Sequence, residues 1–238
     1  MDTLFATKKA KKSSRGHTCA QLFVTDKGFV HVVPMKSKRH VPQAMKEFAK
    51  VIGAPDSIIT DAAREETSAA IKAFCREIDT ELRILERGTQ WANRAELHIG
   101  ILKEAVSKDM REANSPLAFW DYCLERRVRI NNLTAKDLFQ LHGTNAHTAT
   151  LNMEGDISNL SQFGWHEWGH YGEASSRFPY PRDVLCRVLG PSAGSGNEMS
   201  QWALKANGQI VPRRTIRPLT PQETQRDSEE RKKERNDG

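Results

Sequence analysis

The feature that most constrains the fold is the order of extended and helical segments over the first 134 residues. Alternating apolar residues predict strands at 2–6, 17–24, 29–35, 57–60 and 80–85. The turn residues Asp26-Lys27-Gly28 predict that the second and third strands form an antiparallel hairpin. Apolar residues with a period near 3.6 predict helices after Pro42, around Ile71, over 94–112 and after Pro116. This order predicts an α/β fold with a mixed sheet flanked by helices.

The remainder of the chain has a different pattern. Over 155–220, short apolar or aromatic runs are separated by Gly, Pro, Ser and Asn, which predicts a small all-β module of the SH3-like barrel type. Residues 135–154 are predicted to be a linker between this module and the core at 1–134. The aromatic-free tail at 221–238 mixes both charges and is predicted to be disordered.

Composition excludes several classes of protein. No apolar run reaches the roughly 20 residues that span a bilayer, and the start of the chain lacks a signal-peptide pattern. The cysteines are far apart and lie in apolar segments, which predicts buried free thiols in place of disulfides or a zinc site. They are Cys19, Cys75, Cys123 and Cys186. This pattern predicts an intracellular, reducing location.

Positive charge is concentrated at the start of the chain. The net charge is +6, yet residues 1–53 contain eleven Lys and Arg against three Asp and Glu, an excess of eight. Lys and Arg displace condensed counterions from phosphate backbones, so the segment favours a nucleic acid as partner. For any single lysine, ordinary solubilising surface is the simpler interpretation.

Three carboxylates occupy positions that a fold of this order can bring together. Asp2 lies on the first strand, Asp61 directly follows the strand at 57–60, and Glu96 lies in the first turn of the helix at 94–112. In a chain of alternating strands and helices, the end of one strand and the start of a later helix can lie at the same edge of the sheet. Sets of oxygen ligands suit Mg²⁺ or Mn²⁺, so the three residues are predicted to hold divalent metal.

Two motifs around these acids resemble a known family. The loop and helix start at 89–96 (TQWANRAE) and the strand at 58–61 (IITD) resemble the corresponding segments of copia-type retrotransposon and retroviral integrases. Between Asp61 and Glu96 lie 34 residues, close to the spacing typical of that family. The stretch 137–143 (DLFQLHG) also resembles the segment that follows the core in copia-type polyproteins.

The resemblance implies a fold, a reaction and a set of partners. It implies a ribonuclease-H-like core in which Asp2, Asp61 and Glu96 are catalytic and bind Mg²⁺ or Mn²⁺. The implied enzyme is a polynucleotidyl transferase or endonuclease, in which water trims the end of the element's DNA and the new 3′-hydroxyl attacks target DNA. The resemblance also implies that the partners are the DNA ends of the retrotransposon and the target DNA. It further implies a homo-oligomer located in the nucleus.

Four further residues are candidates for DNA contact. Lys103 lies seven residues after Glu96, two helical turns along the same face, and is predicted to position DNA phosphates. Arg94, Gln90 and Asn93, in the loop and at the helix start, are the other candidates. A solvated helix face and loop is the alternative interpretation for each of them.

Two alternatives to an active integrase remain open. The first strand begins only one residue before Asp2, which also fits an inactive integrase relic that binds nucleic acid without catalysis. Asp26 and Glu86 compete with Asp2 and Glu96 as site acids, but their turn and strand-end settings disfavour them. A zinc hydrolase is suggested by His166-Glu167-Trp168-Gly169-His170. Its glycines and aromatics favour a strand, on which the two histidines would be roughly 13 Å apart.

Overall fold

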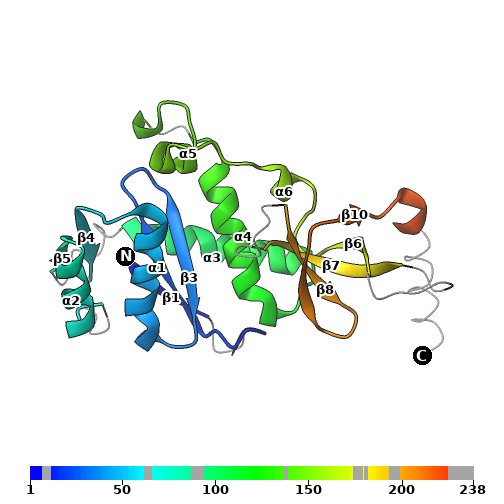
Figure 1. Ribbon diagram of the computed structural model, residues 1–238, viewed down its shortest axis with the longest axis horizontal. Coiled ribbons are helices and arrows are strands. Elements are labelled where there is room, and N and C mark those ends of the chain that lie inside the picture. Colours follow the sequence, from blue (N-terminus) through cyan, green and yellow to red (C-terminus); the bar gives the residue numbers. More distant parts are fainter. Residues whose placement is uncertain are drawn as a thin grey trace. The chain divides into compact units, whose positions relative to one another are not determined.

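The computed structural model describes two compact units, Met1–Asp156 and Ile157–Gly238. Figure 1 shows the order of their elements. The described residues are 1–6, 12–61, 66–86, 94–136, 139–173, 179, 182–192 and 199–224. Within this part of the chain, no helix is long and apolar enough to cross a membrane. The four cysteines are all buried and free, which confirms their predicted state.

The first unit contains strands and helices in the predicted order, so the mixed α/β class is confirmed. Its strands are β1 (Asp2–Phe5), β2 (Cys19–Val24), β3 (Val30–Met35), β4 (Ser57–Thr60) and β5 (Glu81–Ile84). Its helices are α1 (Val41–Ile52), α2 (Ala69–Glu77), α3 (Arg94–Glu112), α4 (Trp120–Leu133) and α5 (Ala146–Leu151). Short 3-10 turns lie at Lys38–His40, Leu117–Phe119 and Phe139–Leu141.

The strands of this unit form two sheets, whereas the sequence predicts one. Strands β1, β2 and β3 form an antiparallel sheet in that order, and the hairpin between β2 and β3 turns at Gly28, whose φ is +74°. Strands β4 and β5 pair in parallel, with Ser57 opposite Glu81. The two sheets approach each other where the Met1 ammonium group donates a hydrogen bond to the Ile59 carbonyl. That bond places the start of β1 beside β4.

The two faces of the antiparallel sheet bury different helices. On one face, Cys19 and Phe23 of β2 belong to a core cluster with residues of α1, β4 and α2, and the rings of Phe23 and Phe48 stack at 4.5 Å. Side chains alternate along a strand, so the fully buried Ala20 and Leu22 face the other way. Helices α3 and α4 pack against β2 and β3. The sheet is therefore covered on both faces, as the α/β class requires.

The structure corrects the buried face of α3. The spacing of apolar residues predicts a buried face made of Leu97, Ile101, Leu102, Ala105 and Val106. Leu102 is buried as predicted, but Leu97 and Ile101 are 66% and 50% exposed. The buried residues at this end of the helix are Ala95, Ile99 and Leu102. Their i, i+4, i+7 spacing is an equally good helical stripe. Packing against the sheet selects this stripe, and the choice leaves Glu96 exposed beside buried Ala95.

Partly buried His31 on β3 is expected to make the stability of the first unit depend on pH. Its ring lies near those of Phe23 and Phe48, at centroid distances of 6.4 and 5.9 Å, and burial lowers its pKa to about 4. An unfolded histidine titrates near 6.5, so its stabilising contribution is complete above that pH. As pH falls from 6.5 towards 4, the unfolded chain takes up a proton that the folded chain does not, and stability is lost.

Urea unfolding at pH 7 and pH 5 measures this effect. Between pH 7 and pH 5, the free energy of unfolding of the wild type is expected to fall by up to about 2 kcal/mol more than that of His31→Gln. Exposed His40 offers a matched control, since His40→Gln is expected to keep the wild-type dependence on pH. Identical pH dependence of the wild type and His31→Gln would contradict the prediction.

The stretch predicted as a linker, 135–154, lies in the first unit and includes α5, which packs against α4. The N-terminus of α5 is capped by Asn145, whose side-chain oxygen accepts a hydrogen bond from the Thr148 N–H at 2.8 Å. Asn145 also forms an isolated bridge with Ala135. The stretch therefore carries secondary structure of its own.

The second unit is a small antiparallel β module. A short helix, α6 (Ser158–Ser161), precedes a sheet with the order β10-β6-β7-β8-β9. The strands are β6 (Glu167–Gly172), β7 (Asp183–Pro191), β8 (Gln201–Lys205), β9 (Ile210–Arg213) and β10 (Ile216–Pro218). Its core is Phe163, Tyr171, Cys186, Val188, Ala203 and Ile216. The SH3-like assignment stays a prediction. Of the tail predicted to be disordered, 221–224 form a helical turn in which Glu223 pairs with Arg217 at 2.9 Å, and 225–238 lie outside the described residues.

The histidine motif lies on a strand. Residues Glu167 to His170 belong to β6, and His166 immediately before it has a φ of +58°. A zinc-protease site needs both histidines on one helical face, so the strand conformation removes the basis for that interpretation.

Candidate functional site

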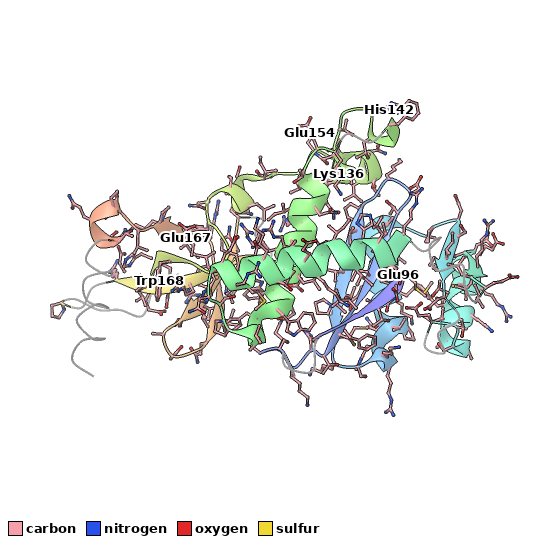
Figure 2. All side chains as sticks on the ribbon, turned by 180° about the vertical axis from the view of Figure 1, so that it is seen from behind. Glu96, Lys136, His142, Glu154, Glu167 and Trp168 are labelled. Atoms are coloured by element: carbon pink, nitrogen blue, oxygen red, sulfur yellow. The ribbon has the colours of Figure 1, made fainter. Side chains whose placement is uncertain are left out.

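The three predicted acids come from three different elements of the first unit. Asp2 begins β1 and lies opposite Leu22 of β2, while Asp61 directly follows β4. Glu96 is in the first turn of α3, the helix that packs against β1 and β2. Figure 2 shows Glu96 at the start of this helix. The fold thus brings a strand start, a strand end and a helix start to one region.

The charges of these acids act on one another. Burial raises the pKa of the half-buried Asp2 carboxyl, and the negative charges of Asp61 and Glu96 raise it further. Two groups oppose this rise: the Thr3 N–H, which donates to Asp2 Oδ1 at 2.6 Å, and the Met1 ammonium. Like charges held near each other disfavour ionisation. Burial is the largest cause of the raised pKa of Asp2, and the smaller contributions of Asp61 and Glu96 show that both carboxylates lie within electrostatic reach of it.

The acids are neighbours, but their side chains do not converge as metal ligands. Among the residues that the structure describes, no three His, Cys, Asp or Glu side chains are placed to hold a metal ion. Asp2 Oδ1 is directed instead to the N–H of the next residue, and Glu96 is exposed at the surface of α3. Charge and position fit a divalent cation, which would offset the repulsion at Asp2. The side-chain orientations would have to change to bind it.

A fourth acid, Glu66, lies next to this cluster and is not predicted from the sequence. It is only 1% exposed, and its carboxylate accepts hydrogen bonds from Thr60 Oγ1, Gln21 Nε2 (2.9 Å) and Thr3 Oγ1 (3.3 Å). Burial raises its pKa, whereas the bonds from Thr60 and Gln21 lower it. Its polar surroundings in the sequence, Arg64-Glu65-Glu66, suggest an exposed loop, so no periodic signal indicates a buried acid.

Two of the predicted DNA-contacting residues are described. Lys103 and Arg94 are both exposed on α3. The Arg94 guanidinium donates to the Asp26 carbonyl at 2.6 Å, which ties the start of α3 to the β2–β3 hairpin. Asp26 Oδ1 accepts from the Lys27 N–H at 2.9 Å, a turn contact. The other two candidates, Gln90 and Asn93, lie outside the described residues.

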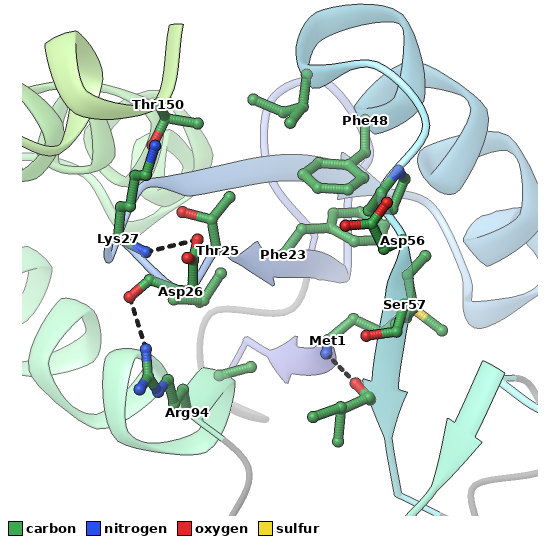
Figure 3. A pocket seen from close by; sticks show the side chains of 16 residues that line it. Met1, Phe23, Thr25, Asp26, Lys27, Phe48, Asp56, Ser57, Arg94 and Thr150 are labelled. Atoms are coloured by element: carbon green, nitrogen blue, oxygen red, sulfur yellow. Dashed lines mark hydrogen bonds between the residues drawn. The ribbon is translucent and has the colours of Figure 1, made fainter. Parts of the chain in front are cut away.

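A cavity of about 570 Å³ lies beside the acids (Figure 3). Its walls come from β2, the end of α1, β4 and the start of α3. Its lining mixes apolar residues, such as Phe23 and Phe48, with polar ones, such as Asp26 and Arg94. Met1 is at its edge, and the hydrogen bonds from Met1 and Arg94 are drawn in the figure. None of the three predicted acids lines it. The cavity therefore adjoins the candidate site without containing it.

Comparisons with known proteins find similar structures but no sequence family. No protein family model matches the chain, and no curated protein matches it. The HTLV-2 integrase catalytic core domain in complex with magnesium is similar in its trimeric form, at 19% identity over 63% of this chain and 92% of that chain, with a TM-score of 0.48. Its dimeric form gives 20% identity, 56% and 83% coverage, and a TM-score of 0.45.

An assembly is among the similar structures as well. The simian T-cell lymphotropic virus intasome in complex with PP2A regulatory subunit B56 gamma is 16% identical, covering 88% of this chain and 76% of that chain, with a TM-score of 0.49. Similarity at this level leaves the function of the chain to be argued from its own residues.

Proposed function

We propose that the chain is a metal-dependent DNA integrase of the copia type, whose first unit is a ribonuclease-H-like catalytic core. The observation that carries the proposal is the placement of Asp2 at the start of β1, Asp61 directly after β4 and Glu96 in the first turn of α3, near enough for Asp61 and Glu96 to contribute to the raised pKa of Asp2. These acids are far apart in the sequence, and the fold gathers them at one place where their charges repel. A protein gains nothing in stability from such an arrangement, which is typical of a site that binds a cation.

Asp2, Asp61 and Glu96 would hold Mg²⁺ or Mn²⁺, since carboxylate oxygens are the ligands that these ions prefer. When bound, two such ions activate an attacking oxygen and stabilise the leaving oxygen of a phosphodiester. The contribution of the chain is to hold the three carboxylates on separate, well-packed elements. Buried Ala95 beside Glu96, and the pairing of β1 with β2, supply that rigidity.

Two exposed cations on α3 and the positive charge of the first 53 residues support DNA as the partner. Lys103 and Arg94 lie on the same helix as Glu96, and the first 53 residues carry an excess of eight positive charges. These groups would contact phosphates and orient the DNA end, with Gln90 and Asn93 flanking the helix start. Chromosomal DNA as target places the protein in the nucleus, and joining two DNA ends calls for a homo-oligomer. The second unit fits an SH3-like DNA-binding module.

The second candidate function is that of an inactive integrase relic that binds nucleic acid only. It is favoured by the orientation of the acids, because no chelating set is assembled among the described side chains. DNA affinity that is unchanged by removal of divalent metal, together with no joining, would distinguish it from the enzyme.

A strand-transfer assay on the full chain tests the proposed function. A duplex with randomised terminal bases serves as donor and a supercoiled plasmid as target, and the junctions are sequenced. Joined products are expected with Mg²⁺ or Mn²⁺ and are expected to disappear with EDTA, because the carboxylates need the ion to approach a phosphate. Retention of DNA on a filter without joining in either metal would favour the relic.

A further inference from the structure

A buried hydrogen-bond network lies on the face of the sheet opposite to Asp2. Thr3 and Gln21 are partners across β1 and β2, and Thr3 Oγ1 donates to Gln21 Oε1 at 2.7 Å. Side chains alternate along β1, so Thr3 points to the face of Met1, which belongs to the α1 core cluster. Asp2 points to the other face, where α3 carries Glu96.

Glu66 joins this network to β4. Its Oε1 accepts from Gln21 Nε2 at 2.9 Å, and its Oε2 accepts from the Thr60 hydroxyl. Thr3 Oγ1 lies 3.3 Å from the same Oε1, but its single proton is given mainly to Gln21 Oε1 at 2.7 Å, so Thr3 reaches Glu66 chiefly through Gln21. Thr60, Gln21 and Glu66 are all almost fully buried. One carboxylate thus connects β1, β2 and β4, although β1 and β4 belong to different sheets. Together with the Met1–Ile59 bond, it links the two sheets.

The two hydroxyl groups belong to residues next to two of the predicted acids. Thr3 follows Asp2 in the chain, and Thr60 precedes Asp61. A shift of either hydroxyl relative to Glu66 moves the backbone that carries the neighbouring acid. We infer that Glu66 is a positioning residue: its buried carboxylate, through Thr3 and Thr60, sets the separation of Asp2 and Asp61 in the metal site of the proposed integrase.

The inference rests on the proposed function, and Mn²⁺ affinity is its direct measure. Thr60→Val keeps the shape of the side chain and removes the hydroxyl, so Glu66 no longer holds β4. We expect ten- to a hundredfold weaker Mn²⁺ binding by calorimetry, about the loss typical when a group that orients a metal ligand is removed. The rate of strand transfer at saturating DNA is expected to fall together with the Mn²⁺ affinity. Thr60→Ser keeps the hydroxyl, so it is expected to have wild-type Mn²⁺ affinity and strand transfer.

Thr80→Val is the matched control. Thr80 is also buried, and its hydroxyl donates to the Pro55 carbonyl at 2.7 Å, at the opposite end of the β4–β5 sheet. Its loss removes a hydrogen bond of similar burial without touching Glu66. Mn²⁺ affinity equal to the wild type is expected for Thr80→Val. Equal weakening in Thr80→Val and Thr60→Val would show a general loss of packing and overturn the inference.

Glu66→Met removes the carboxylate itself at similar length and is expected to weaken Mn²⁺ binding at least as much as Thr60→Val. It leaves buried donors unpaired, so the variant can fail to fold. A second measurement covers that case: the urea midpoints of Thr3→Val, Thr60→Val and the double variant. Because both hydroxyls act through one carboxylate, the double variant is expected to shift the midpoint by less than the two single shifts combined.

The outcomes separate the inference from the proposed function. Wild-type protein that neither binds Mn²⁺ nor joins DNA would refute the proposed function and, with it, the role of Glu66 in a metal site. The midpoints of the threonine variants would still show whether Glu66 connects the two strands. Wild-type protein that binds Mn²⁺, with Thr60→Val binding it equally well, would overturn the positioning role alone. Additive midpoint shifts would likewise overturn the connection through Glu66.

Discussion

Asp61→Asn and Glu96→Gln are each expected to reduce strand transfer by at least about a hundredfold. Loss of a group that only orients a metal ligand reduces activity by roughly 10- to 100-fold. Loss of a direct metal ligand is expected to reduce it by at least about a hundredfold. Both substitutions keep the size of the side chain and remove one negative charge. The rate of appearance of joined product, at fixed Mg²⁺ or Mn²⁺, is the measurement, and Asp2→Asn is expected to behave in the same way.

Matched controls are available on the same two elements. Asp56 is exposed at the opposite end of β4, and Glu104 is exposed on α3, eight residues after Glu96. Asp56→Asn and Glu104→Gln are expected to retain activity close to that of the wild type. Equal activity in the wild type, Asp61→Asn and Glu96→Gln would refute the catalytic assignment.

The stability of these variants separates loss of chemistry from loss of structure. Glu96 contributes to the raised pKa of Asp2, so removing its charge in Glu96→Gln relieves repulsion in the folded state. Glu96→Gln is therefore expected to unfold at the same urea concentration as the wild type or at a higher one. Residues placed for function commonly reduce stability, so removing one of them should not destabilise the protein. An inactive variant that is also less stable would therefore indicate a structural role for its acid.

Asp121→Ala is expected to cost the first unit about 3 kcal/mol of unfolding free energy, as is usual when one partner of a buried ion pair is removed. Asp121 on α4 is fully buried, and its Oδ2 accepts from Arg15 Nε at 2.8 Å and contacts His17 Nδ1 at 2.7 Å. Arg15 also pairs with Glu125 at 2.9 Å and lies over the Tyr122 ring at 3.9 Å. The network holds the segment before β2 against α4.

Urea unfolding monitored by circular dichroism measures this loss. Glu81→Ala is a suitable control, because the Glu81–Arg83 pair has a similar distance of 2.7 Å but both side chains are largely exposed. Exposed pairs contribute little, so its midpoint is expected to stay near that of the wild type. A midpoint for Asp121→Ala that is as close to the wild type as that of Glu81→Ala would contradict the prediction.

The arrangement of the acids was only partly predictable. Asp61 after a strand and Glu96 in the first helical turn follow from local patterns, and the structure has both at those positions. The buried state of Glu66 does not follow, because its three partners lie 6, 45 and 63 residues away in the chain. Hydrophobic periodicity predicts contacts only within a regular helix or strand. It does not predict contacts between different elements or with a residue in a loop, as Glu66 is.

The sequence by itself determined the order of strands and helices, the hairpin at Gly28 and the free state of the cysteines, since each depends on short-range preferences. Tertiary structure decided which stripe of α3 is buried, because Leu97 with Ile101 and Ala95 with Ile99 are equivalent until a sheet packs against one of them. It also decided that the strands divide into two sheets, with Glu66 connecting them. The proximity of Asp2 to Asp61 and Glu96 depends on those long-range contacts, which no single segment contains.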